Sequence, residues 1–382
     1  MVAPSHQLYT PEQAARSSLG AVRYQSTLAR RLAKPLTGVQ QAGRGMTVNF
    51  KSPIFIDPAR VYTRDMRRSE TPIEYSDLYQ DNLSIELTDQ VYNAVKLPDD
   101  FYTFTLENLE QQVIRPMAQS VADHIDSVVV GALTGVQAGL SAADKAPKGS
   151  IVADDGTVFP KTVNKNDTLE EVAAKARKEF RDSGKKFAAF GAGVNGITDA
   201  SLKADSRRTA LRAVRAASQL LGMRGVANGD RVLVVGSAWE AAFLDAEQLR
   251  FVDRAGADGA LRQATIGNLY GFEVIVDYSI DSTAAYALDA EGVALVTQTT
   301  TIPRGAAFAS TITEGGFTLR YLQDYDPDIL TDRAVVDTFA GAKILDSQRV
   351  LKLTGTETMS ELSGDEAPAS TGTGSGSGSN GS

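Results

Sequence analysis

The sequence contains no cysteine and only two histidines, His6 and His124. The lack of cysteine excludes disulfides and thiolate metal sites, and two histidines are too few for a histidine-based zinc centre. No run of 18 or more apolar residues occurs, and no basic-then-apolar leader opens the chain. We therefore expect no metal, no membrane-spanning segment and no secretion signal.

The composition describes a chain that can bury a core but does not favour nucleic acid. Hydrophobic residues make up 42% of the 382 residues, which is enough for two domains or for one domain with large excursions. The 47 acidic residues outnumber the 39 basic ones and give a net charge of −8. That charge balance argues against binding of nucleic acid by the protein surface as a whole, although it leaves a local basic patch possible.

The strongest periodic signal predicts a long helix from Thr105 to Ala132. Apolar residues recur there at helical spacing from Leu109 to Val128, which indicates one continuous face packed on a core. Pro116 falls inside the helix and predicts a bend or a broken hydrogen bond. His124 lies on or beside the apolar face, where we expect a packing role.

Residues 1–45 carry six basic side chains and one acidic side chain, Glu12. Arg16, Arg23 and Arg30 are seven residues apart and would share one face of a helix, with few apolar residues opposite. Three interpretations remain open: a solvated helix, an arm that docks on a neighbouring subunit or acidic partner, and a helix on a membrane surface.

Residues 46–100 alternate between apolar and polar side chains, which predicts two long strands. A charged tip from Arg64 to Pro72 joins them. A two-stranded excursion is marginal in water unless another element covers it, and no helix lies nearby in the sequence. We expect a protruding hairpin that packs on another subunit, with Arg64, Arg67, Arg68 and Glu70 at the contact.

The remaining chain reads as an α/β body followed by an antiparallel sheet and a low-complexity tail. Asp167 or Thr168 is expected to cap a helix that runs to Arg181. Further elements are predicted at 151–159 (a small hairpin), 206–221 and 238–249 (helices), and 231–237, 272–277, 293–297, 305–310, 316–323 and 334–347 (strands). The Gly- and Ser-rich end of 352–382 predicts a disordered tail.

Three patterns suggest chemistry without completing a motif. Gly191, Gly193 and Gly196 match the dinucleotide fingerprint, but the residues that follow make a poor helix start. Asp324, Asp326 and Asp328 lack the glycine and distal glutamate of a calcium loop, which favours a charged turn. Arg207, Arg208, Arg212 and Arg215 form a basic face that suits solvent, phosphate or a subunit contact. We expect neither an enzyme nor a cofactor.

Three stretches together resemble a known family: residues 83–133, 229–253 continuing through 261–277, and 317–345. Their order is similar to that of the major capsid proteins of tailed phages, in the branch that includes the P22 coat protein. The resemblance implies an α+β, Hong-Kong-97-like capsid fold. Its parts would be a long spine helix, an extended β-hairpin called the E-loop, a P-domain sheet and an α/β A-domain.

By this resemblance the chain divides into six parts. They are an N-terminal arm at 1–45, the E-loop at 46–104, the P-domain spine helix at 105–137, the A-domain at 138–315, P-domain strands at 316–351 and a flexible tail at 352–382. No extra domain interrupts the body, and no scaffolding segment precedes the arm, which implies a separate scaffolding protein. No set of crosslinking residues can be assigned.

The resemblance implies a coat protein that self-assembles as hexamers and pentamers into an icosahedral head. The head would enclose double-stranded DNA without sequence-specific binding, and assembly would occur in the host cytoplasm. Expected partners are other copies of the chain, a scaffolding protein, a portal and a decoration protein. The alternatives are the shell protein of an encapsulin-type compartment and, less favoured, a nucleotide-binding enzyme that uses the Gly191 loop.

Overall fold

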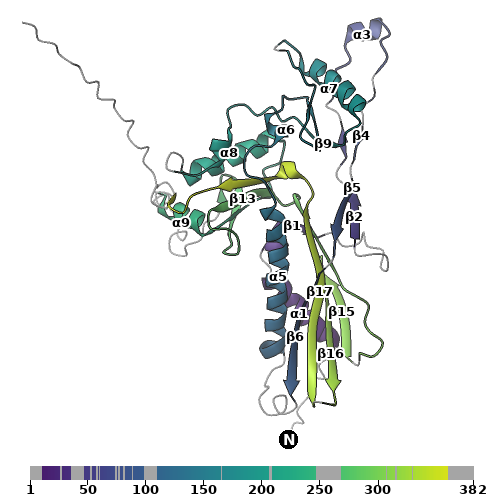
Figure 1. The fold of residues 1–382 in the computed structure, drawn as a ribbon, viewed down its shortest axis with the longest axis vertical. Helices are drawn as coiled ribbons and strands as arrows, with labels where there is room; N and C mark the ends of the chain where they lie inside the picture. The colour runs from purple at the N-terminus through teal and green to yellow at the C-terminus, as the bar shows by residue number, and fades with distance from the viewer. Residues whose placement is uncertain are drawn as a thin grey trace, which may run out of the picture.

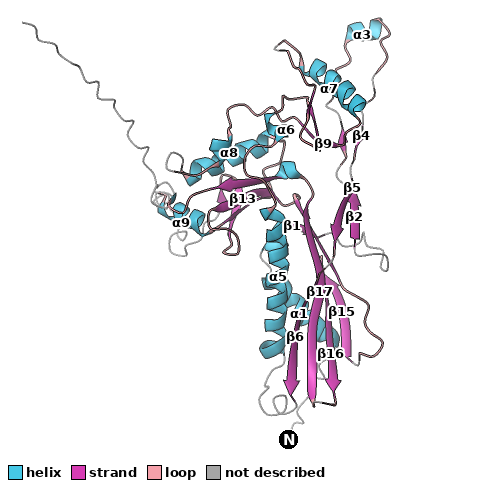
Figure 2. Ribbon diagram, in the orientation of Figure 1, coloured by secondary structure: helices cyan, strands magenta, loops and turns pink. Residues whose placement is uncertain are grey.

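The computed structural model describes most of the chain between Pro11 and Met359. The described residues are 11–25, 28–35, 47–51, 54–56, 59, 61–73, 75, 78–80, 82–87, 89–98, 110–164, 166–205, 209–246, 268–306, 308–314, 316–328 and 330–359. A long helix lies beside a long sheet, an α/β body sits at one end of them, and a hairpin rises past the body (Figure 1). Helices and strands are mixed throughout, as Figure 2 shows, and the predicted α+β class is confirmed.

The long predicted helix is present as α5, Arg115–Thr134. A π-helical turn at Glu110–Ile114 leads into it, so the regular hydrogen bonding begins immediately before Pro116. The proline nitrogen has no hydrogen to donate, which accounts for the change of helix type at this point. The first predicted turns, from 105 to 109, lie outside the described residues.

One face of α5 is buried, but the buried positions differ from the predicted ones near its middle. The predicted packing role of His124 is wrong, because its side chain is exposed and Ile125, 1% exposed, takes the core position. Farther along, Val128 is half-buried and Val129 is fully buried. The buried stripe drifts in this way because a turn holds 3.6 residues and not a whole number.

A six-stranded sheet packs on the buried face of α5, and we call it the spine sheet. Its longest strand, β17, pairs with β16 along one edge and with β6 and β14 along the other. The strands are β1 (Ala33–Pro35), β6 (Gln90–Pro98), β14 (Val293–Gln298), β15 (Phe308–Glu314), β16 (Phe317–Asp326) and β17 (Thr331–Ile344). Its core therefore joins segments from nearly the whole length of the chain.

The N-terminal helices pack on this same core, contrary to the expectation of a helix that buries little. Helix α1, Pro11–Gln25, lies against α5, β15 and β16. Ala14 and Ala15 are fully buried together with Leu19, because small side chains let the helix approach the sheet closely. Helix α2, Leu28–Leu32, is tied to α5 by the amide of Ala29, which donates to the carboxylate of Asp126 at 2.8 Å.

A second sheet of five strands, the body sheet, forms the centre of the α/β part. The predicted strand β10 pairs in parallel with β12 and antiparallel with β13. Its strands are β10 (Arg231–Val235), β11 (Asn268–Leu269), β12 (Phe272–Val276), β13 (Ala284–Asp289) and β18 (Val350–Thr354). Helices α8, Ala210–Met223, and α9, Ser237–Asp245, share an apolar core with it that contains the fully buried Trp239.

A third, small sheet carries helix α7, Leu169–Ser183. Its strands are β7 (Ile151–Ala153), β8 (Val158–Phe159) and β9 (Phe187–Phe190), and β7 with β8 is the hairpin predicted at 151–159. Thr168 caps α7: its hydroxyl accepts from the amide of Glu171, whose carboxylate accepts from the amide of Thr168. The predicted start of this helix is confirmed. A short helix, α6 (Ala142–Lys145), precedes β7, and single 3-10 turns lie at Asp199–Leu202 and Ser347–Arg349.

The chain crosses between the sheets more often than the predicted boundaries allow. Strands β14 and β15, within the predicted body at 138–315, join the spine sheet. Strand β18 runs into the predicted tail and joins the body sheet, and Met359 is 4% exposed. Residues 352–359 are therefore packed, while 360–382 lie outside the described residues.

The predicted hairpin is present but shorter at its base than the alternation suggested. Strand β2, Thr47–Lys51, pairs with β5, Asn82–Glu86, and farther out β3, Phe55–Ile56, pairs with β4, Leu78–Tyr79. Val91 and Val95, predicted in its second strand, belong to β6 of the spine sheet. A one-turn helix, α3, forms the tip at Arg64–Arg68 (Figure 1).

Candidate functional site

The glycine motif at 191–196 is not arranged to bind a phosphate. A strand, β9, does precede it, but no α-helix opens within it. The amides of Gly191, Ala192, Gly193 and Val194 all donate to carbonyl oxygens of the segment 143–150, at 2.8–3.1 Å. A phosphate site of this type needs those amides free. A side chain at Gly191 would also meet the carbonyl oxygen of Pro147 at 2.2 Å, so the glycine serves close packing.

The aspartates of 324–328 lie at the end of β16 and in the turn that leads to β17. Arg333 contacts the carboxylates of Asp326 at 3.4 Å and Asp324 at 3.9 Å, and the amide of Asp328 donates to Asp326. Within the described part of the chain, no three acidic or histidine side chains are grouped to hold a metal ion. These contacts are those of a charged turn.

The hairpin tip presents three arginines on one short helix. The hydroxyl of Thr63 accepts from the amide of Met66 and caps α3. Arg64, Arg67 and Arg68 are spaced three and four residues apart, which places them on one face. All three are exposed, and within the described residues none of their side chains has a hydrogen bond or ion pair. Glu70, also exposed, follows with a positive φ of 52° that turns the chain back.

Large apolar side chains accompany these charges along the hairpin. Six of them are more than half exposed: Ile54, Ile56, Val61, Ile73, Tyr75 and Leu78. Ile56 and Leu78 face each other across the β3–β4 ladder and are 56% and 69% exposed. Clusters of exposed apolar residues beside charges are typical of protein–protein contact surfaces.

The base of the hairpin is fixed to the spine sheet of its own chain. Val48, Ile85 and Leu87 are buried against Ala294 and Val296 of β14. The ammonium of Lys343 on β17 donates to the carbonyl oxygen of Ser84 at 3.0 Å. Beneath the hairpin Gly341 has no side chain, and a Cβ there would lie 2.8 Å from Ile85 Cγ2. The hairpin therefore protrudes from a firm anchor.

The seven predicted contact residues fall into two separate surfaces. Arg16 and Arg30 are exposed on α1 and α2, and Arg23 belongs to α1, although its side chain lies outside the described part. These helices pack beside α5, in the other half of the molecule from the tip (Figure 1). The structure therefore does not bring the N-terminal arginines together with the arginines and glutamate of the tip.

Sequence reasoning missed the point where the hairpin meets the body. Tyr79 of β4 stacks on Phe187 of β9, with ring centroids 4.6 Å apart and planes 19° from parallel. Phe180 and Phe190 contact the same ring edge-on at 6.0 and 5.9 Å. The alternation of β4 marks Tyr79 as facing opposite to Leu78, but its partners lie about a hundred residues away and give no local signal.

The described helices include none that is both long and apolar enough to cross a membrane. No curated protein matches the sequence. Among solved structures, the chain is similar to a chain from Mycobacterium phage Che8, with 15% identity, a TM-score of 0.48, and 87% of this chain and 92% of that chain covered.

Two further structures are similar over comparable lengths. The capsid of Ralstonia phage GP4 is 13% identical, with a TM-score of 0.47 and 87% and 91% coverage of this chain and of that chain. A virus-like particle from Pyrococcus furiosus is 10% identical, with a TM-score of 0.40 and 90% and 98% coverage.

The sequence itself matches a family. A sequence model described as phage capsid protein aligns with residues 99–352, which is more than half of the chain. The match begins directly after β6, continues through α5 and the body and ends within β18, and so includes strands of both large sheets. The resemblance predicted from the sequence is confirmed: the chain belongs to the phage capsid protein family and is a structural coat protein of the virion.

Proposed function

We propose that copies of this chain associate as hexamers and pentamers into a closed icosahedral head around double-stranded DNA. The observation that carries the proposal is the hairpin, which is anchored in its own spine sheet and yet exposes its far half. Exposed apolar side chains cost free energy in water, at about 25 cal/mol per Å² of apolar surface. A neighbouring copy that covered Ile73, Tyr75 and Leu78 would recover that free energy.

The charges of the tip support a specific contact between copies rather than non-specific hydrophobic association. Arg64, Arg67 and Arg68 lack partners within the described chain, and guanidinium groups pair well with carboxylates at the rim of an interface. The chain as a whole is acidic, so other copies offer carboxylates. A head contains many identical contacts of this kind, each of which can be weak.

We also propose the division of labour implied by the resemblance. The hairpin from β2 to β5 acts as the E-loop, α5 with the spine sheet, including β6, as the P-domain that joins capsomers, and the α/β body as the A-domain toward the capsomer centre. The exposed arginines at 16 and 30, together with Arg23, form a second contact between copies. A separate scaffolding protein, a portal and a decoration protein complete the particle, which assembles in the host cytoplasm without a catalytic step.

The direct test is to replace the tip, residues 61–73, with a Gly-Ser linker in the full chain. We expect the body and spine to fold, as judged by an unchanged circular dichroism spectrum, and particles to be absent from negative-stain micrographs. A matched variant with Arg64, Arg67 and Arg68 changed to lysine keeps the charges and should assemble, while the glutamate variant should not. Normal particles from the linker variant would contradict the proposed role of the hairpin.

A further inference from the structure

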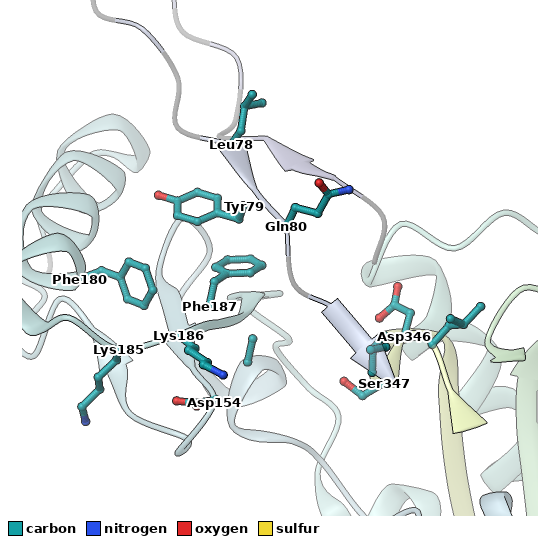
Figure 3. A pocket seen from close by; sticks show the side chains of 13 residues that line it. Leu78, Tyr79, Gln80, Asp154, Phe180, Lys185, Lys186, Phe187, Asp346 and Ser347 are labelled. Carbon is teal, nitrogen blue, oxygen red and sulfur yellow. The ribbon is translucent and has the colours of Figure 1, made fainter. Parts of the chain in front are cut away.

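The hairpin touches its own chain at two separated places. At the base, Ile85 and Leu87 pack on the spine sheet. Farther out, the ring of Tyr79 is inserted among Phe180 of α7 and Phe187 and Phe190 of β9. Figure 3 shows the Tyr79 and Phe187 rings lying face to face, with the Phe180 ring to one side and Leu78 pointing away from them.

Between these two places the hairpin spans a hollow of about 540 Å³. Gln80 and Leu83 line it from the hairpin, Asp154 from the turn after β7, Lys186 from the residue before β9, and Ser347 from the segment before β18. Among the described residues, the two ladders of the hairpin, β2–β5 and β3–β4, are two separate two-stranded sheets. The outer ladder and the tip are thus carried past the hollow and meet the body through Tyr79.

The aromatic contact is strong enough to select one direction for the hairpin. Offset and edge-on aromatic pairs add free energy beyond the area they bury. Loss of three such pairs lowers the ratio of docked to undocked hairpin by about 10- to 2,000-fold. The other contacts of the cluster, among Phe159, Phe180 and Phe187, join the small sheet to α7 and do not include the hairpin.

We infer that Tyr79 is a positioning residue for assembly: it docks the hairpin on the aromatic cluster of its own body and so sets the direction in which the tip reaches a second copy. This inference rests on the proposed function, because it assigns the cause of the tip's orientation. Docking through this ring also makes the orientation reversible, since a neighbour that pulled the hairpin away would break the Tyr79 contact and leave the buried base in place.

The absence of cysteine makes the orientation directly measurable. Pro72→Cys at the tip and Lys178→Cys on α7 introduce the only two thiols of the chain, and both positions are exposed. Spin labels on this pair report the tip-to-body distance in unassembled full-length protein. We expect a single narrow distance distribution in the parent pair and a dominant broad one after Tyr79→Ala.

Two matched variants separate docking from general damage. Tyr79→Phe keeps the ring and should keep the narrow distribution. Tyr75→Ala removes another tyrosine of the same hairpin that is 91% exposed, and it should also leave the distribution narrow. Phe187→Ala removes the stacking partner from the body side. Its effect combined with Tyr79→Ala should be no larger than either effect alone, because both changes break the same contact.

Assembly is followed by light scattering on the same variants without labels. The inference expects Tyr79→Ala to assemble at least about tenfold more slowly than the parent, with Tyr79→Phe at the parental rate. A narrow distribution in Tyr79→Ala would overturn docking, and a broad one with parental assembly would overturn positioning. Both results are independent of the tip-replacement experiment, because that variant keeps Tyr79 and tests the role of the hairpin in assembly separately.

Discussion

A buried ion pair between Asp144 of α6 and Arg224, the residue that follows α8, supports a quantitative prediction. The side chains of Asp144 and Arg224 are 0% and 2% exposed. Arg224 donates to both carboxylate oxygens, through Nε at 2.8 Å and Nη2 at 2.7 Å, and also to the carbonyl oxygen of Gln348 at 2.8 Å. The amide and hydroxyl of Ser141 complete the shell around the carboxylate, each at 2.8 Å.

Asp144→Asn keeps the shape of the side chain and removes its charge. The guanidinium of Arg224 then stays buried without a counter-charge, which costs about 3–5 kcal/mol in comparable sites. Because small domains are stable by about 5–15 kcal/mol in total, this loss is large. The double variant Asp144→Leu with Arg224→Met removes both charges, and it should recover most of the loss.

The measurement is urea unfolding of unassembled protein at pH 7, followed by circular dichroism. We expect the midpoint of Asp144→Asn to fall well below that of the parent and that of the double variant to lie between them or above. A change below about 1 kcal/mol in the single variant would refute the reasoning, because it would mean that water or another acid compensates the arginine.

The same pair predicts how stability changes with pH. Burial raises the pKa of Asp144, but the hydrogen bonds and charge of Arg224, with those from Ser141, outweigh it and hold the pKa below its ordinary value of 3.8. A carboxyl with a lowered pKa in the folded state adds stability above the unfolded value, and this is lost as the pH falls through the lowered pKa. The stability of the parent and of Asp144→Asn should therefore converge below about pH 4.

Two further predictions test the packing. Val129→Asp buries an unpaired charge in the core under α5 and should leave the protein insoluble. Ser127→Asp, on the exposed face of the same helix, should stay soluble. A soluble Val129→Asp protein with the parental melting temperature would contradict the assignment of the buried face. Gly341→Val forces a side chain against Ile85 and should lower the free energy of unfolding by about 1–3 kcal/mol, as measured by thermal unfolding. The control Gly20→Ala should lower it less, because nothing lies within 4 Å of the new Cβ. Equal losses in the two variants would contradict the close approach of the hairpin base to Gly341.

Local patterns in the sequence determined the elements whose cause is local. The 3.6-residue period marked α5, and its break at Pro116 follows from the missing amide hydrogen. The reciprocal contacts of Thr168 and Glu171 lie three residues apart, so the start of α7 could be read directly. The apolar run at Arg231–Val235 and the alternation at 83–87 likewise predicted a buried strand and one side of the hairpin. The exposed charged tip followed from its composition.

Tertiary structure alone decided which of these elements meet. Ala14 and Ala15 carry too little apolar area to predict a buried helix, and they are buried because α5 and the spine sheet accept a closely packed helix there. Strand β18 pairs with β13, more than sixty residues earlier, and Tyr79 finds its partners on α7 and β9. Contacts at such separations depend on the path of the whole chain, which no local period encodes. The sequence by itself therefore determined the helices, the hairpin and the family, and the fold decided that the hairpin is anchored twice on its own chain before it can reach another.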